Sequence, residues 1–119
     1  MTIAIWIFSG LLALLYLAAG VMKSLLPAER IAKNFPWTET VGFPATRVIG
    51  VLEFLGAIGL ILPPLTGIAP IVAGFAAAGL ALVQVGAIAT HIRRHEKFIA
   101  NIVLLLLAAF VAVGRFLGY

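Results

Sequence analysis

Four long stretches of this sequence contain almost no charged residue, and they constrain the fold more than any other feature. They cover about residues 3–22, 46–62, 68–91 and 98–116, and Glu53 is the only acidic residue within them. A helix needs about 20 predominantly apolar residues to cross the hydrocarbon core of a bilayer. Strands of a membrane barrel alternate polar and apolar residues, whereas these stretches are continuously apolar. We therefore predict an all-α polytopic membrane four-helix bundle, with residues 1–119 forming a single transmembrane domain.

Composition supports a membrane environment and excludes several kinds of chemistry. The chain is 64% hydrophobic and only 10% charged, whereas soluble domains contain about 25% charged residues. It has no cysteine, which excludes disulfides, thiol redox chemistry and iron–sulfur clusters. His91 and His95 are four residues apart, but no further ligand completes a metal shell at a recognisable spacing, so no metal site is predicted.

The distribution of basic residues predicts the orientation in the membrane. Seven of the eight lysines and arginines lie at the ends of the stretches joined by the loops after the first and the third: Lys23, Arg30, Lys33, Arg47, Arg93, Arg94 and Lys97. Because cytoplasmic loops are enriched in lysine and arginine, this side is predicted to be cytoplasmic and both termini to lie outside, in a cell (inner) membrane. The net charge of +4 is thus a topology signal, and no nucleic-acid binding is predicted. The first stretch lacks a basic n-region, so we expect a retained helix rather than a removed signal peptide.

The loop between the first two stretches has a pattern of its own. Between Pro27 and Pro36, Ile31 and Phe35 are four residues apart with polar residues on the other faces, which predicts a short helix lying in the membrane interface. Trp37 and Phe43 are expected to extend this aromatic anchor. The loop is interpreted as a connector, with a lid over a cavity or a docking surface as alternatives.

Glu53 is the residue most able to carry chemistry. It lies about 10 Å deep by the helical rise per residue, where an ionised carboxylate is costly unless it is paired, hydrated or protonated. One interpretation is an ion pair that fixes helix packing; the other is a carboxylate that transfers protons or anchors a ligand. Gly50, Gly56 and Gly59 flank it at three-residue spacing and predict close helix packing.

Other polar side chains fall at a similar depth in the remaining helices. Tyr16 shares a face of its helix with Lys23, Gln84 shares one with His91, and Asn101 lies slightly closer to the basic side. These residues predict a polar pocket that opens toward the cytoplasm, with His91 as a hydrogen-bond or proton partner. The alternative is a set of separate interhelical hydrogen bonds, each worth about 0.6 kcal/mol.

Three motifs resemble those of the DoxX-like family of small four-helix membrane proteins. Ala18 to Lys23 reads A-A-G-x-x-K, residues 47–60 read R-x-I-G-x-x-E-x-x-G-A-x-G-L, and residues 90–96 resemble T-H-x-R-R-G-E with His95 replacing the glycine. The resemblance covers nearly the whole chain and is more specific for the family than for any activity. By position, Lys23, Glu53 and His91 match recurrent polar positions of the family.

The resemblance implies two functions of different classes. The family takes its name from a membrane subunit associated with thiosulfate:quinone oxidoreductase, which implies a membrane subunit of a redox system that binds a quinone or similar isoprenoid lipid. In that hypothesis Glu53 and His91 handle protons, while Tyr16, Gln84 and Asn101 bond carbonyl oxygens, and a membrane or cytoplasmic redox protein is the partner. Distant animal relatives imply an assembly or scaffold factor without chemistry. Transport of a small cation neutralised by Glu53, as a homo-oligomer, is a third alternative, and the sequence assigns no reaction.

Overall fold

The structure, a computed structural model that describes residues 1–119, is entirely helical. Six helices follow one another along the chain: α1 (Thr2–Leu25), α2 (Ala28–Asn34), α3 (Thr38–Val41), α4 (Phe43–Thr66), α5 (Val72–Arg93) and α6 (Ile99–Phe116). The predicted all-α fold, with a short helix between the first two spans, is confirmed.

Four of these helices, α1, α4, α5 and α6, are long and apolar enough to cross a membrane. Their outward faces carry large apolar side chains that are more than half exposed, including Leu14, Leu55, Leu82 and Leu106. A soluble monomer rarely exposes apolar surface on this scale. The apolar outer surface is suited to a lipid bilayer, and the protein is a multi-pass membrane protein.

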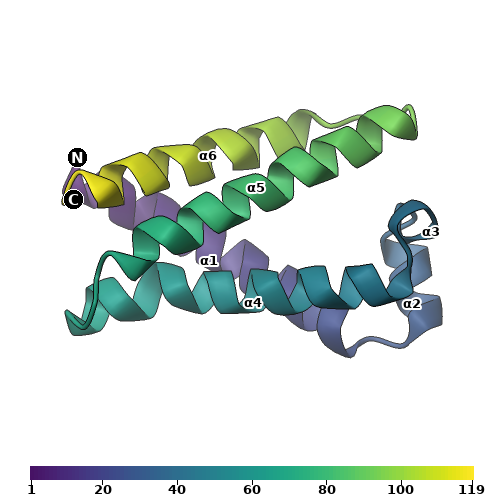
Figure 1. The fold of residues 1–119 in the computed structure, drawn as a ribbon, viewed down its shortest axis with the longest axis horizontal. Helices are drawn as coiled ribbons and strands as arrows, with labels where there is room; N and C mark the ends of the chain where they lie inside the picture. The colour runs from purple at the N-terminus through teal and green to yellow at the C-terminus, as the bar shows by residue number, and fades with distance from the viewer.

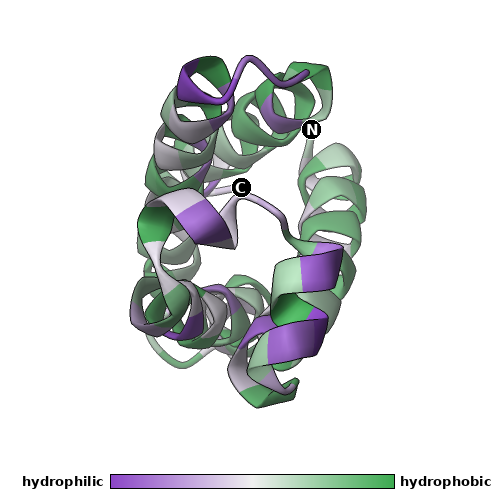
Figure 2. Ribbon diagram, turned by 90° about the vertical axis from the view of Figure 1, so that its right-hand side faces the viewer, coloured by the Kyte–Doolittle hydropathy of each residue, from purple (hydrophilic) through white to green (hydrophobic).

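The four spans form a ring in the order α1, α4, α5, α6 (Figure 1). The closest packing is between α1 and α4 and between α5 and α6, whereas helices that face each other across the ring make little contact. Both termini and the α4–α5 turn lie at one end, here named the terminal end. The α2–α3 segment and the α5–α6 turn lie at the other, here named the basic end, where Figure 2 shows hydrophilic residues in the foreground.

The apolar core occupies the middle of the ring and its terminal half. Leu12, Leu60, Leu80 and Val111 are buried there, one from each spanning helix. Toward the terminal end, the ring of Phe116 packs edge-on against Phe75, with centroids 5.1 Å apart. Buried apolar side chains therefore fill the centre of the bundle, and this aromatic pair lies at a more exposed part of the terminal half.

The prediction that the second span stops at Leu62 was wrong. Pro63 and Pro64 lie inside α4, which continues to Thr66. The two prolines remove only two amide donors near the end of the helix, and the last turn still forms because the Gly67 amide donates to the Pro63 carbonyl, 3.0 Å away. Gly67, with φ of 75°, ends the helix in the left-handed region that glycine adopts without strain.

The last span ends at Phe116 as predicted, and the other bounds differ by one to four residues from the predicted ones. The first helix extends to Leu25 instead of residue 22, α4 begins at Phe43 instead of 46, and α5 begins at Val72 instead of 68. Between the first two spans, α2 buries Ile31 completely, and α3 adds a single turn that the sequence pattern did not predict.

Candidate functional site

A cavity of about 550 Å³ lies in the basic half of the bundle. It is lined by all four spanning helices and by the segment around α3, and ten of its 17 lining residues are hydrophobic. The polar residues singled out from the sequence all line it: Tyr16, Lys23, Glu53, Gln84, His91 and Asn101. The structure thus brings the six together, and their functional roles remain predictions.

Lys23 is the cation beside Glu53. Its Nζ lies 2.7 Å from Oε1 of Glu53, and the two side chains are 10% and 3% exposed. The aromatic rings of Phe35 and Trp37 stand 5.2 and 5.1 Å from the same ammonium group, close enough for cation–π attraction. The buried charge of Glu53 is therefore neutralised inside the protein.

The sequence places this ion pair by letting α1 and α4 approach closely. A Cβ on Gly50 would lie 2.6 Å from the Lys23 Cβ, and one on Gly20 would lie 2.6 Å from the amide nitrogen of Phe54. Only glycine fits at two such crossing points. The motif residues Gly20 and Lys23 on α1 thus meet Gly50 and Glu53 on α4.

Arg47 makes a second polar contact between α4 and the end of α1. Its guanidinium donates hydrogen bonds to the carbonyls of Lys23, at 3.3 Å, and Leu26. These carbonyls lie in the last turn of α1 and at its C-cap, where a helix has no intrahelical donors for them. Arg47 and Glu53 therefore hold the backbone and the side chain of the same α1 segment.

The predicted packing glycines face two neighbours rather than one. Gly50 meets α1, whereas a Cβ on Gly56 or Gly59 would lie 2.9 Å from Leu80 or Ala76 of α5. At 3.6 residues per turn, two positions three residues apart fall about 60° short of a full rotation around the helix axis. The glycine series consequently winds around α4 and allows close packing on both sides.

A second polar group joins three helices on the cavity wall. The Gln84 amide nitrogen donates to the Tyr16 hydroxyl, and the Asn101 amide nitrogen donates to Gln84 Oε1 at 2.9 Å. Tyr16 and Gln84 are buried. This chain of hydrogen bonds links α1, α5 and α6 and leaves the Tyr16 hydroxyl proton available for donation.

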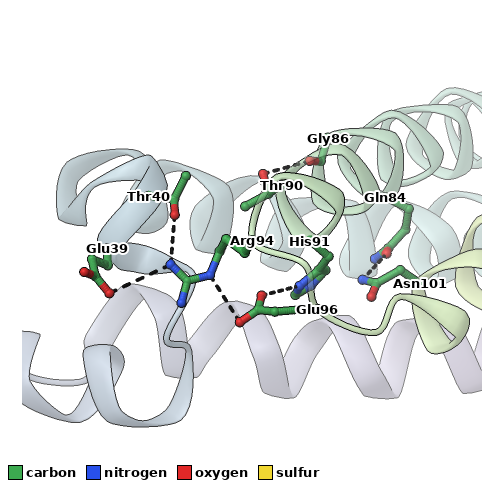
Figure 3. A network of polar contacts seen from close by, with 9 residues as sticks. All are labelled: Glu39, Thr40, Gln84, Gly86, Thr90, His91, Arg94, Glu96 and Asn101. Carbon is green, nitrogen blue, oxygen red and sulfur yellow. Dashed lines mark hydrogen bonds and ion pairs between the residues drawn. The ribbon is translucent and has the colours of Figure 1, made fainter.

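His91 belongs to a third group, which reaches the α5–α6 turn (Figure 3). Its Nδ1 lies 2.9 Å from Oε1 of Glu96, and Oε2 of Glu96 lies 3.2 Å from Nε of Arg94. Arg94 also donates to the Thr40 hydroxyl at 2.9 Å. The His91 hydrogen bond and the Arg94 charge hold the pKa of Glu96 below its ordinary value.

His95 stands where the family pattern has glycine, and its backbone explains that pattern. Its φ of 56° lies in the left-handed region. The amide of Glu96 donates to the His91 carbonyl and the amide of His95 to the Ile92 carbonyl, which is the Schellman ending of a helix. His95 is exposed and does not line the cavity.

Sequence reasoning missed several residues around the cavity. Phe35 and Trp37 were interpreted as interface anchors, but both line the cavity and cover Lys23. Arg47 and Arg94 were counted only as topology signals, and Glu96 was assigned no role. Glu96 follows His91 by five residues, just beyond the end of α5. A Schellman ending at that point brings the two residues together, so this spacing could have predicted the contact.

Comparison with known proteins agrees with the motifs that meet at the α1–α4 junction. No curated protein and no solved structure matches the chain. A family model described as the DoxX-like family matches residues 7–113, which include α4 and α5, most of α1 and α6, and all six cavity residues predicted from the sequence. The chain belongs to the DoxX-like family.

Proposed function

We propose that the protein binds a quinone or similar isoprenoid lipid in the basic-half cavity, as the membrane subunit of a redox system. The observation that carries this proposal is a largely apolar cavity of about 550 Å³ on whose wall polar side chains from all four spans converge. Sites for small organic ligands typically measure about 300–1,000 Å³ and combine an apolar lining with a few placed polar groups. The cavity fits that description.

Hydrogen-bonding capacity supports a ligand with carbonyl oxygens. Tyr16 accepts a bond from Gln84, so its own proton is free to be donated to a carbonyl of the ligand. Lys23 has three donors and gives one to Glu53. In this proposal Glu53 and His91 handle protons, while Tyr16, Gln84 and Asn101 position the head group.

The two alternative functions explain less of the cavity. A scaffold without a ligand accounts for the glycine contacts between helices, but it gives no reason for a large cavity with polar walls. Transport of a small cation requires a carboxylate that can neutralise it, and the Glu53 carboxylate is already paired with Lys23. Ligand binding therefore remains the function that the geometry supports best.

We place the protein in the inner membrane of the cell. In this proposal the basic end faces the cytoplasm. Seven of the eight lysines and arginines lie at or near that end, which favours its retention on the cytoplasmic side. The chain has no cysteine, so labelling of a single introduced cysteine shows on which side of the membrane that position lies. A membrane-impermeant maleimide should label Tyr119→Cys in intact spheroplasts and Lys33→Cys only after lysis.

The test of ligand binding compares the only two tyrosines of the chain. The probe is a short-chain ubiquinone added to the purified full-length protein in detergent, with affinity measured by quenching of tryptophan fluorescence. Tyr16→Phe removes one donated hydrogen bond and should weaken binding by about 5- to 10-fold. Tyr119→Phe, at an exposed residue of the terminal end, is the matched control and should bind as the wild type does.

Two results would contradict the proposal. One is a wild-type protein that does not bind the quinone; the other is equal binding by the wild type and Tyr16→Phe. Mass spectrometry of lipids that co-purify with the protein provides an independent measurement. A retained quinone supports the redox role, whereas a protein that folds and carries no lipid in the cavity favours the scaffold.

A further inference from the structure

Glu96 connects two side chains whose roles differ. One carboxylate oxygen faces Nδ1 of His91 at 2.9 Å, and the other faces Nε of Arg94 at 3.2 Å. His91 lines the cavity, whereas Arg94 and Glu96 do not. Glu96 is thus a link between the cavity wall and the polar groups outside it, as Figure 3 shows.

The charge of Glu96 determines which nitrogen of His91 carries the proton. The lowered pKa of Glu96 keeps this carboxylate ionised at neutral pH, and an ionised carboxylate only accepts hydrogen bonds. Nδ1 of His91 must therefore be the donor. In the neutral imidazole the other nitrogen, Nε2, is then unprotonated and acts as an acceptor.

Arg94 fixes Glu96 in turn. Its guanidinium pairs with Glu96 and donates to Thr40 of α3, and it lies 3.8 Å from the Glu39 carboxylate of the same helix. Arg94 is also the last residue of the α5 ending that His95 completes. The orientation of the imidazole is thus set from both the α5–α6 turn and α3.

We propose that Glu96 is a positioning residue that holds His91 with Nε2 unprotonated, so that this nitrogen accepts a hydrogen bond from a hydroxyl group of the ligand. The ligand-binding part rests on the proposed function and extends it. Tyr16 supplies a donor for a carbonyl oxygen, and His91 supplies an acceptor for a hydroxyl. The cavity therefore recognises the reduced, hydroxyl-bearing form of a quinone through a residue that the oxidised form does not use.

The tautomer of His91 can be measured without any ligand. Nitrogen NMR of the full-length protein labelled at its two histidines, recorded as the pH is raised until the imidazole signals no longer change, distinguishes the two tautomers of each neutral ring. His91 should show a single tautomer protonated at Nδ1, while the exposed His95 averages over both tautomers. Glu96→Gln, whose amide can donate as well as accept, should turn His91 into a mixture, and Glu29→Gln on the exposed face of α2 should change nothing.

Binding of a matched pair of probes tests the second half of the inference. A short-chain ubiquinol and its ubiquinone, kept anaerobic, are titrated into the wild type, Glu96→Gln and Glu29→Gln. Glu96→Gln should weaken ubiquinol binding by about 5- to 10-fold and leave ubiquinone binding unchanged. A purely structural role of Glu96 would weaken both forms equally.

The outcomes separate this inference from the proposed function. A His91 imidazole protonated at Nε2, a tautomer unaffected by Glu96→Gln, or equal loss of both probes overturns the inference. A wild type that binds neither probe, with His91 held in the Nδ1–H tautomer until Glu96 is changed, overturns the proposed function and supports the positioning by Glu96. Circular dichroism of each variant confirms that the helices are intact.

Discussion

The two halves of the bundle solve the problem of helix packing in opposite ways. In the terminal half, apolar side chains such as Leu60 and Val111 are fully buried, and Phe75 and Phe116 pack edge-on at a more exposed position. In the basic half, the helices are held by buried charges and hydrogen bonds around a cavity of about 550 Å³. Apolar burial is non-directional, whereas removing one partner of a buried ion pair leaves an uncompensated charge inside the protein. We therefore expect the basic half to be the more sensitive to substitution.

The largest effect is expected from breaking the buried ion pair. Glu53→Gln leaves the Lys23 ammonium buried without a carboxylate and should lower the free energy of unfolding by about 3–5 kcal/mol. Unfolding in mixed micelles, followed by circular dichroism, measures the loss. The double variant Lys23→Met/Glu53→Leu removes both charges and should regain most of the stability, because a buried pair can often be replaced by apolar residues.

If the double variant is as unstable as Glu53→Gln, charge neutralisation does not explain the contact. If the double variant does regain stability, it should still bind the ubiquinone probe more weakly than the wild type, since the Lys23 ammonium and the Glu53 carboxylate are both gone from the cavity wall. The same double substitution would then restore stability without restoring ligand binding. That separation decides between the two interpretations of Glu53 that the sequence left open.

A smaller effect is expected from filling a glycine contact in each half. Gly20→Ala places a methyl group against backbone atoms of Gly50 and Phe54, which cannot move independently, and should cost about 1–3 kcal/mol. Gly114→Ala in the terminal half meets only side-chain atoms, Cδ1 and Cγ1 of the buried Ile5, which can shift more readily than backbone, and should cost less. Equal losses in the same unfolding assay would show that the two halves do not differ in rigidity.

The ends of α5 and α6 offer a matched pair with a still smaller effect. Both end in the Schellman arrangement, with His95 at φ of 56° in one and Gly118 at φ of 97° in the other. His95→Gly relieves the left-handed strain of a side chain and should stabilise the protein by up to about 1 kcal/mol. Gly118→Ala should destabilise it by a similar amount, and a loss of stability in His95→Gly would reveal a contact of the imidazole.

The smallest effect is a dependence on pH confined to the basic half, which contains all four glutamates of the chain. Because the folded protein lowers the pKa of Glu96 below 4.5, this group stabilises the fold above its unfolded pKa. That stabilisation is lost as pH falls through the lower, folded pKa. The melting temperatures of the wild type and Glu96→Gln should differ at pH 7 and converge in acid; a constant difference would exclude this linkage.

The sequence predicted the four spans and the depth of the polar residues because both follow from local regularities. Long apolar runs require helices in lipid, and the helical rise places Tyr16, Glu53 and Gln84 at one level. The short helix between the first two spans was predicted from the spacing of Ile31 and Phe35. These inferences needed no knowledge of which helices are neighbours.

Pairings between helices could not be predicted in the same way. Lys23 was placed on the same face as Tyr16, but its contact with Glu53 depends on α1 and α4 being adjacent and on the Gly20 and Gly50 crossings. The Glu96–His91 contact depends on a chain reversal at His95, a residue type that does not mark such a turn as glycine does. The end of α4 was misjudged because proline was treated as an absolute stop.

The closed end of the cavity limits the routes by which a ligand could enter and leave. None of the lining residues comes from the terminal half, where the core that includes Leu12 and Leu60 closes the interior. Under the proposed function, a ligand therefore has no exit through the far face and leaves by the route through which it entered. In that proposal the protein retains a ligand within one half of the bilayer and does not pass it across the membrane.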